Sequence, residues 1–491
     1  MAKNTQTKNA DTLWSPLVKI VALVCAIVLL AAIALAVVAK TGYFRRNTVV
    51  MNVGNTEINA LEYNYAYYGA LNDFYSQYYY YASMIGFDLS TSLKSQQCYF
   101  DSTKSWYDYF VDQAKSQLEE QYLIYNKAVE DGFTMTEESA KSLETSLQEL
   151  ESAAKEADTS INKYLQSIYG PNITYDEYKE FISRRMLIAD YYEHYMDSLE
   201  YADEKIDEYY SENKKDYDVV KYYTYTAKAD TENNKTAQDV ADGIKSASTD
   251  VQTYLDALKA IVGEDTFKEE TYLKEGATYT KDDETSEWLF NDERKAGDVT
   301  VIKKAATSSS STDTYTVICF VERGRETYNL ATMRHILFSV EDLTDDDGNV
   351  IEDEEGNAKT NDAEQKAEAE KILKEWKDGA ATAESFAALV KDNSDDTGSV
   401  EDGGLYEDFD KNTMVDEITD WIWAEGRKAG DCEIVKTDYG YHIVYFVEYG
   451  DEKWNSDIVN TLKSEDYEEL LKTLEEKYPV NFNEKGLSQV G

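Results

Sequence analysis

Apolar and polar residues alternate along this chain in three patterns: one long apolar run, stretches of helical periodicity and short strand-like stretches. From Ile20 to Ala39 neither a charge nor a proline interrupts the apolar run. About 20 apolar residues are enough for a helix to cross the hydrocarbon core of a membrane. A signal peptide cleaved near Ala34-Leu35-Ala36 is the alternative, but the apolar region of a signal peptide is only about 7–15 residues long. We therefore expect a transmembrane anchor at residues 20–40, after a cytoplasmic tail at residues 1–19.

The basic residues on the two sides of this run are nearly balanced, so the positive-inside rule alone does not orient it. The residues are Lys3, Lys8 and Lys19 before the run and Lys40, Arg45 and Arg46 after it. A long remainder is translocated largely regardless of its charge. We expect a single-pass protein of the cell membrane with the bulk of the chain extracytoplasmic.

The stretch from about Thr48 to Asp218 has mostly helical periodicity and is rich in tyrosine, after a short strand at Val49–Val53. Six tyrosines recur at near-helical intervals: Tyr63, Tyr67, Tyr68, Tyr75, Tyr78 and Tyr79. Tyrosines at this spacing are either core residues of packed helices or a surface that binds unfolded clients, since tyrosine offers a rigid amphipathic contact area. The sequence leaves both interpretations open.

Two strand-like stretches further along each contain a histidine, His335 in Met333–Phe338 and His442 in Asp438–Val444. Between them, in order, lie Ser394-Asp395-Asp396, Asp402-Gly403-Gly404, Met414 and Trp421-Ile422-Trp423.

An internal repeat links this region to the preceding one. Trp288-Leu289-Phe290 with Arg294–Asp298 recurs as Trp421-Ile422-Trp423 with Arg427–Asp431, and Phe320-Val321-Glu322 recurs as Phe446-Val447-Glu448. If Val220–Tyr223 matches Met333–Ile336, Tyr222 stands at the position of His335 and Thr316 at that of His442.

The order and spacing of the histidine-containing segments resemble the parvulins, the smallest family of peptidyl-prolyl isomerases. This resemblance implies a parvulin domain at residues 327–450 and, through the repeat, a degenerate parvulin-like module without the histidines at residues 218–326. The helical stretch resembles the chaperone domain of PrsA/SurA-type foldases, which implies such a domain at residues 48–217, completed by a C-terminal helix within residues 452–491. We therefore expect an α+β multidomain fold: a transmembrane helix, a mostly α-helical SurA-like domain and two parvulin-like α+β modules.

Isomerisation of an X-Pro bond requires rotation about a partial double bond with a barrier of roughly 18–20 kcal/mol. No bond is broken, so neither a nucleophile, a metal nor a cofactor is required. A site must instead hold the proline ring in an apolar pocket and stabilise the twisted amide with a preorganised polar network.

The resemblance assigns residues to both tasks. His335 and His442 would form a hydrogen-bonded pair on adjacent strands, Asp396 would face the twisting amide, and Thr437 would orient the histidines. Met414, Ile418 and Trp423 would line the proline pocket, although the family usually has Phe at the last two positions. Leu405–Phe409 also departs from the family, which commonly has Asp-Leu-Gly there. A satisfied core position is the other role open to each histidine, and a loop cap beside Gly398 is the other role open to Asp396.

Composition narrows the range of partners. The net charge of −47 argues against nucleic acid, since phosphate binding needs clustered Lys and Arg. Such a charge favours solubility, or acidic faces that hold basic unfolded clients or cations. The acidic segment Asp345–Asn357 does not have the ligand register of an EF-hand, so we expect a solvated hairpin there and no metal site. Four cysteines without metal spacing give no disulfide framework.

These patterns predict a membrane-anchored peptidyl-prolyl isomerase and chaperone whose partners are unfolded secreted polypeptides with X-Pro bonds. With only three prolines in the chain, its substrates are other proteins. A homodimer is compatible with the sequence. The alternative function is a non-catalytic holdase or scaffold that uses the parvulin fold only to bind clients.

Overall fold

The computed structural model describes residues 24–30, 37–38, 40–307, 312–345, 348–353 and 355–491. The predicted tail, residues 1–19, and most of the predicted anchor, residues 20–40, lie outside the described residues. Among the described helices, none combines the length and the apolar character needed to cross a membrane. The chain divides into two compact units: Met1–Glu200 with Lys463–Gly491, and Tyr201–Leu462.

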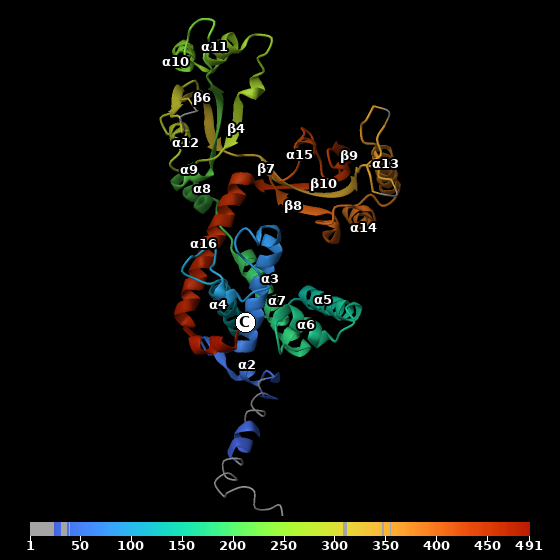
Figure 1. The fold of residues 1–491 in the computed structure, drawn as a ribbon. Helices are drawn as coiled ribbons and strands as arrows, with labels where there is room; N and C mark the ends of the chain where they lie inside the picture. Colours follow the sequence, from blue (N-terminus) through green and yellow to red (C-terminus); the bar gives the residue numbers. More distant parts are fainter. Residues whose placement is uncertain (1–23, 31–36, 39, 308–311, 346–347, 354) are drawn as a thin grey trace, which may run out of the picture. The chain divides into compact units, whose positions relative to one another are not determined.

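The first unit is mainly helical (Figure 1). Its helices are α2 (Tyr43–Asn47), α3 (Ala60–Tyr78), α4 (Trp106–Glu130), α5 (Glu137–Glu156), α6 (Ile161–Tyr169) and α7 (Tyr175–Ser198). Polar side chains define where the long helices begin: Asn59 caps α3, and Ser105 with Asp108 forms a capping box at the start of α4. A small sheet in the order β11-β1-β2 joins β1 (Val49–Val53), β2 (Thr56–Asn59) and the C-terminal strand β11 (Val480–Phe482).

The periodic tyrosines of α3 face mainly into this unit. Tyr63 and Tyr67 are 0% and 3% exposed, and Tyr68, Tyr75 and Tyr78 are partly buried against the same core. Most of the six therefore pack helices together.

The second unit contains two four-stranded antiparallel sheets with the same topology, β4-β3-β6-β5 and β8-β7-β10-β9. The first sheet consists of β3 (Asp218–Thr226), β4 (Leu273–Ala277), β5 (Val299–Lys304) and β6 (Thr314–Arg325). The second consists of β7 (Asn329–Ser339), β8 (Leu405–Phe409), β9 (Cys432–Thr437) and β10 (Gly440–Glu452). The helices are α8 (Asp203–Glu212), α9 (Lys214–Tyr217), α10 (Ala237–Ala247), α11 (Val251–Val262), α12 (Glu284–Leu289), α13 (Asp362–Asp378), α14 (Ala383–Asn393) and α15 (Asp416–Ile422). Helix α16 (Lys453–Lys477) continues from this unit into the first. The prediction of an α+β multidomain fold with helical and sheet modules is therefore confirmed.

The strand pairing corrects one detail of the internal repeat. His335 pairs with Val444, and the repeat equates Val444 with Ile318, which pairs with Thr224. Thr224, not Tyr222, therefore stands at the position of His335. The alignment was wrong by two residues: the same register irregularity lies just before Met333 and just before Tyr222, so Tyr222 matches Met333. Neither residue is a histidine, so the first module still lacks the paired imidazoles.

The two faces of the second sheet bury different cores. On one face α13 and α14 pack on a cluster that contains Ile336, Phe338 and Ile443. On the other face α15 packs on a cluster that contains Met333 and Val444. Because side chains alternate along a strand, His335 points to the same face of β7 as Met333, which is the α15 face.

Candidate active site

The central strands β7 and β10 bring the two histidines together. His442 pairs with Leu337 and His335 with Val444, so the histidines are diagonal neighbours on one face of the sheet. Their Nδ1 atoms are 3.1 Å apart, and the rings are nearly parallel, with centroids 5.3 Å apart. Each histidine is only 5% exposed.

Asp396 extends this pair on the His335 side. It follows the C-terminal end of α14, where the Ser394 hydroxyl accepts a hydrogen bond from the Asp396 N–H. The Asp396 Oδ2 atom lies 2.7 Å from His335 Nε2 and accepts a hydrogen bond from Ser399 Oγ at 2.5 Å. Tyr406 on β8 donates its hydroxyl to the same oxygen at 3.1 Å. One carboxylate oxygen therefore receives three side-chain hydrogen bonds.

Thr437, at the end of β9, extends the pair on the other side. Its Oγ1 atom lies 3.0 Å from His442 Nε2 and accepts a hydrogen bond from the N–H of Tyr439 at 3.1 Å. The hydroxyl proton of Thr437 is therefore free to point at His442.

Burial and hydrogen bonding set the charges of these groups. Burial alone raises the pKa of the Asp396 carboxyl, but hydrogen bonds from Ser399 and His335 outweigh it and lower the pKa to about 2. Burial lowers the pKa of His335, against the opposing effect of Asp396. Burial and the neighbouring His335 lower the pKa of His442 to about 4. At neutral pH Asp396 is therefore ionised and both imidazoles are neutral.

These charges determine the direction of each hydrogen bond in the row formed by Asp396, His335, His442 and Thr437. The ionised carboxylate only accepts, so His335 Nε2 carries the proton and its Nδ1 is an acceptor. His442 must then donate from Nδ1, and its Nε2 accepts from the hydroxyl of Thr437. All four groups are thus aligned, with each proton directed toward the carboxylate of Asp396.

The three residues predicted to line a proline pocket lie in the α15-face cluster. Met414 and Trp423 are partly buried, and the Trp423 indole N–H donates to the carbonyl oxygen of Asn329 at 2.9 Å. Ile418 is 1% exposed. Its side chain packs in the same cluster as Met414 and Trp423 and presents little surface to solvent.

Three further residues shape the site. Ser399 and Tyr406 hold Asp396, and a Cβ at Gly404 would lie 2.3 Å from the carbonyl oxygen of His335. Gly404 has φ +71°, which also favours glycine. The unusual Leu405–Phe409 segment was visible in the sequence, but its contact with Asp396 depends on the β7–β8 register, which the sequence does not specify.

An antiparallel sheet that holds paired histidines beside a carboxylate is the arrangement expected of a parvulin-type domain. Residues 335–448 match the model of the rotamase family, described as the PPIC-type PPIASE domain. The prediction of a parvulin-type peptidyl-prolyl isomerase domain is therefore confirmed.

The similar curated proteins are mostly foldases. The foldase protein PrsA of Exiguobacterium sibiricum is 32% identical over 90 residues, which cover 18% of this chain and 28% of the relative. The foldase protein PrsA 3 of Bacillus anthracis is 43% identical over 76 residues, which cover 15% of this chain and 26% of the relative. The matches thus span about a quarter to a third of these relatives, and the resemblance to PrsA-type foldases is confirmed.

Solved structures give a weaker likeness. The crystal structure of PrsA from Bacillus subtilis is 12% identical, covers 89% of this chain and 96% of its own, and has a TM-score of 0.25. That of PrsA from Bacillus anthracis is 23% identical, covers 31% of this chain and 61% of its own, and has a TM-score of 0.19.

Proposed function

We propose that this chain is a membrane-anchored, extracytoplasmic peptidyl-prolyl cis-trans isomerase and chaperone that assists the folding of secreted polypeptides. The observation that carries the proposal is the buried pair of neutral histidines aligned on an ionised Asp396 within a rotamase domain. A histidine pair that served only to fill the core would need no ionised carboxylate beside it. The side chain of Asp396 is 20% exposed, so this geometry does not favour a holdase without activity.

The candidate site residues would have two roles: some would hold the proline ring and the others would stabilise the twisted amide. Met414 and Trp423, supported by Ile418 from within the core, would hold the proline ring on the α15 face. Asp396 would face the twisting amide. His335, backed by His442, would keep the Asp396 carboxylate ionised and oriented, and Thr437 would determine the tautomer of His442. A network that is already aligned needs little reorganisation when the amide loses its planarity, and this lowers the barrier to rotation.

The clients would be unfolded secreted chains, in which X-Pro isomerisation takes tens to hundreds of seconds and limits folding. The first sheet module would bind or space clients without catalysis, because Thr224 and Thr316 replace the two histidines.

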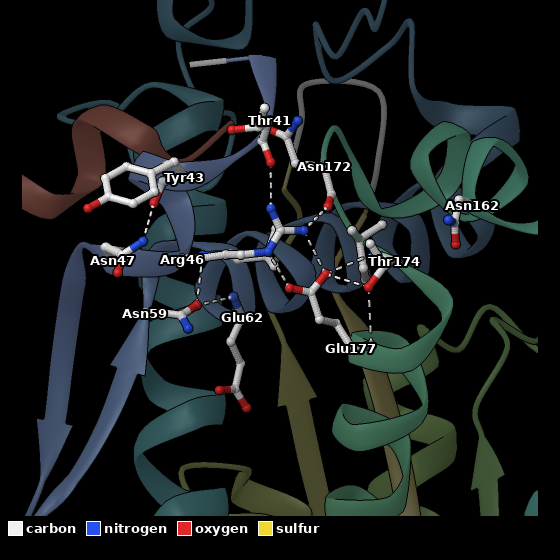
Figure 2. A network of polar contacts seen from close by, with 12 residues as sticks. Thr41, Tyr43, Arg46, Asn47, Asn59, Glu62, Asn162, Asn172, Thr174 and Glu177 are labelled. Atoms are coloured by element: carbon white, nitrogen blue, oxygen red, sulfur yellow. Dashed lines mark hydrogen bonds and ion pairs between the residues drawn. The ribbon is translucent and has the colours of Figure 1, made fainter. Parts of the chain in front are cut away.

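The residues that follow the apolar run bear on the orientation of the proposed anchor. Arg46 forms an ion pair with Glu177, with Nε and Oε1 2.5 Å apart, and donates to the carbonyl oxygens of Thr41 and Asn172 (Figure 2). Arg45 donates to the carbonyl oxygen of Gln489 at 2.9 Å.

Both arginines after the run therefore serve the folded first unit, and their charge gives no reason to place this flank in the cytoplasm. The carbonyl oxygen of Lys40 accepts a hydrogen bond from the side chain of Asn172 at 3.0 Å, so an anchor ending at Lys40 would hold the unit close to the membrane surface. Cell fractionation tests the anchor: the full chain should remain in the membrane after alkaline extraction and be digested by protease added outside the cell. Release by alkali, or full protection, would contradict this placement.

Refolding of a secreted protein limited by one X-Pro bond tests the function. The full chain should accelerate the slow phase, and the Asp396→Asn variant should not. Suppression of aggregation by both proteins without acceleration by either would leave only the holdase.

A further inference from the structure

The first unit contains an open pocket, lined by residues of α3, α4, α6 and α7, that the isomerase site does not use. Its cavity volume is about 170 Å³. Tyr65 lies at its wall, with its ring centroid 4.7 Å from that of Tyr169 and 5.3 Å from that of Phe181. Leu118 and Ile188 complete an apolar surface. The walls thus suit a large apolar or aromatic side chain.

The polar groups of the pocket include the side-chain amides of two glutamines. Gln117 and Gln121 of α4 line it, are partly exposed, and make no side-chain hydrogen bond to any residue that the structure describes. A primary amide both donates and accepts, so these side chains can bind the N–H and C=O groups of an extended peptide.

Two of the nine arginines of this acidic chain also line the pocket. Arg184 is neutralised by Glu62, at 2.5 Å, and by Glu180, at 2.8 Å. Arg185 has no carboxylate partner within the described part of the chain, although Asp73 also lines the pocket. Arg185 donates a long hydrogen bond, of 3.4 Å, from its guanidinium to the hydroxyl of Tyr65. An arginine in this state is suited to a ligand carboxylate, which its planar donors bind in pairs.

Gly69 indicates that the pocket is kept open. It lies inside α3 and lines the pocket, and a Cβ at this position would meet no atom within 4 Å. Glycine inside a helix costs about 0.5–1 kcal/mol relative to alanine, and no close packing explains this one. A missing side chain at this position leaves the space to a ligand.

We propose that this pocket binds an extended peptide through one large apolar side chain and an adjacent carboxylate. The carboxylate is either the C-terminus of the peptide or an acidic side chain next to the apolar residue. The inference rests on the chaperone part of the proposed function and does not depend on the isomerase part.

Fluorescence anisotropy of labelled peptides with the full chain tests the chemistry. A hexapeptide ending in Phe with a free carboxylate should bind about tenfold more tightly than its C-terminal amide, because a charge-assisted pair is lost. If instead an amidated peptide with internal Phe-Glu shows this advantage over Phe-Gln, the carboxylate comes from a side chain. Equal binding of the charged and neutral peptides, or no binding of any, would overturn the proposal.

Substitution of Gly69 tests the location. The Gly69→Leu variant should weaken binding about tenfold or more, because leucine fills the pocket. Gly243→Leu is the matched control, since Gly243 lies inside α10 and a Cβ there also meets nothing within 4 Å. Both variants should melt at similar temperatures and isomerise X-Pro tetrapeptides at the native rate, which separates this test from the isomerase proposal.

Arg185→Gln should remove only the preference for the carboxylate. Native binding by both Gly69→Leu and Arg185→Gln would contradict the assignment.

Discussion

Acidification tests whether the buried histidines are neutral. Burial and the adjacent His335 lower the pKa of His442 from 6.5 to about 4, whereas an exposed histidine titrates near 6.5. A protonated His442 has no acceptor for the hydroxyl of Thr437, so the aligned network would break. We predict that isomerase activity stays nearly constant as the pH falls from 7 to about 5.5 and is lost as the pH approaches 4.

The same shift has a consequence for stability. A histidine pKa that falls from 6.5 to about 4 on folding corresponds to a free energy of about 3 kcal/mol. Between these pH values the unfolded chain binds a proton at His442 and the folded chain does not, so stability increases with pH. The contribution of neutral, buried His442 to the free energy of unfolding is complete above pH 6.5 and is lost as the pH falls toward 4. At pH 5 the free energy of unfolding should be lower by about 2 kcal/mol.

Exchange NMR of X-Pro tetrapeptides measures the rate without a helper protease and therefore suits the acidic range. The Thr437→Val variant should lose activity at a higher pH than the native chain, because neutral His442 loses its hydrogen-bond donor. Thr437→Ser keeps the hydroxyl and should retain the native profile. A native profile that falls with a midpoint near pH 6.5 would refute the assignment of neutral, buried imidazoles.

Two substitutions near Asp396 and His335 test the remaining geometry. Gly404→Ala would place a Cβ 2.3 Å from the carbonyl oxygen of His335, whereas Gly426→Ala has the same kind of positive φ but open space. Calorimetry should show a clearly lower melting temperature for Gly404→Ala than for Gly426→Ala, and equal shifts would show that the close approach is unimportant. Tyr406→Phe removes one of three side-chain donors to Asp396. Because a hydrogen bond contributes about 1 kcal/mol, kcat/KM should fall about fivefold; an unchanged value would show that this donor does not support the site.

The sequence predicted which residues lie together at the centre of the candidate site, and their catalytic roles stay predictions. The resemblance to the parvulins led us to expect His335 and His442 on adjacent strands, which is where the structure has them. Asp396 and Thr437 were predicted through the same resemblance, and both contact the histidines.

The parts that failed depend on contacts between segments distant in sequence. The strand pairing placed Thr224, not Tyr222, at the position of His335, and the local sequence of β3 does not specify which partner each residue has. The hydrogen bond from Tyr406 to Asp396 and the burial of Ile418 at 1% exposure likewise follow from how β8 and α15 pack on the sheet. Alternation predicts that a residue is on a strand, but not which partner lies beside it.

The central claim is that this chain isomerises X-Pro bonds at the histidine pair held by Asp396. The most direct measurement is the cis–trans exchange rate of tetrapeptides with different residues before proline, with the native full chain and with Asp396→Asn and His442→Ala. The native chain should accelerate exchange, and Asp396→Asn should reduce kcat/KM by about tenfold or more, because a charged partner of three hydrogen bonds is lost. Absence of acceleration for every residue before proline, from a chain with a cooperative melting transition, would contradict the claim, as would native rates in both variants.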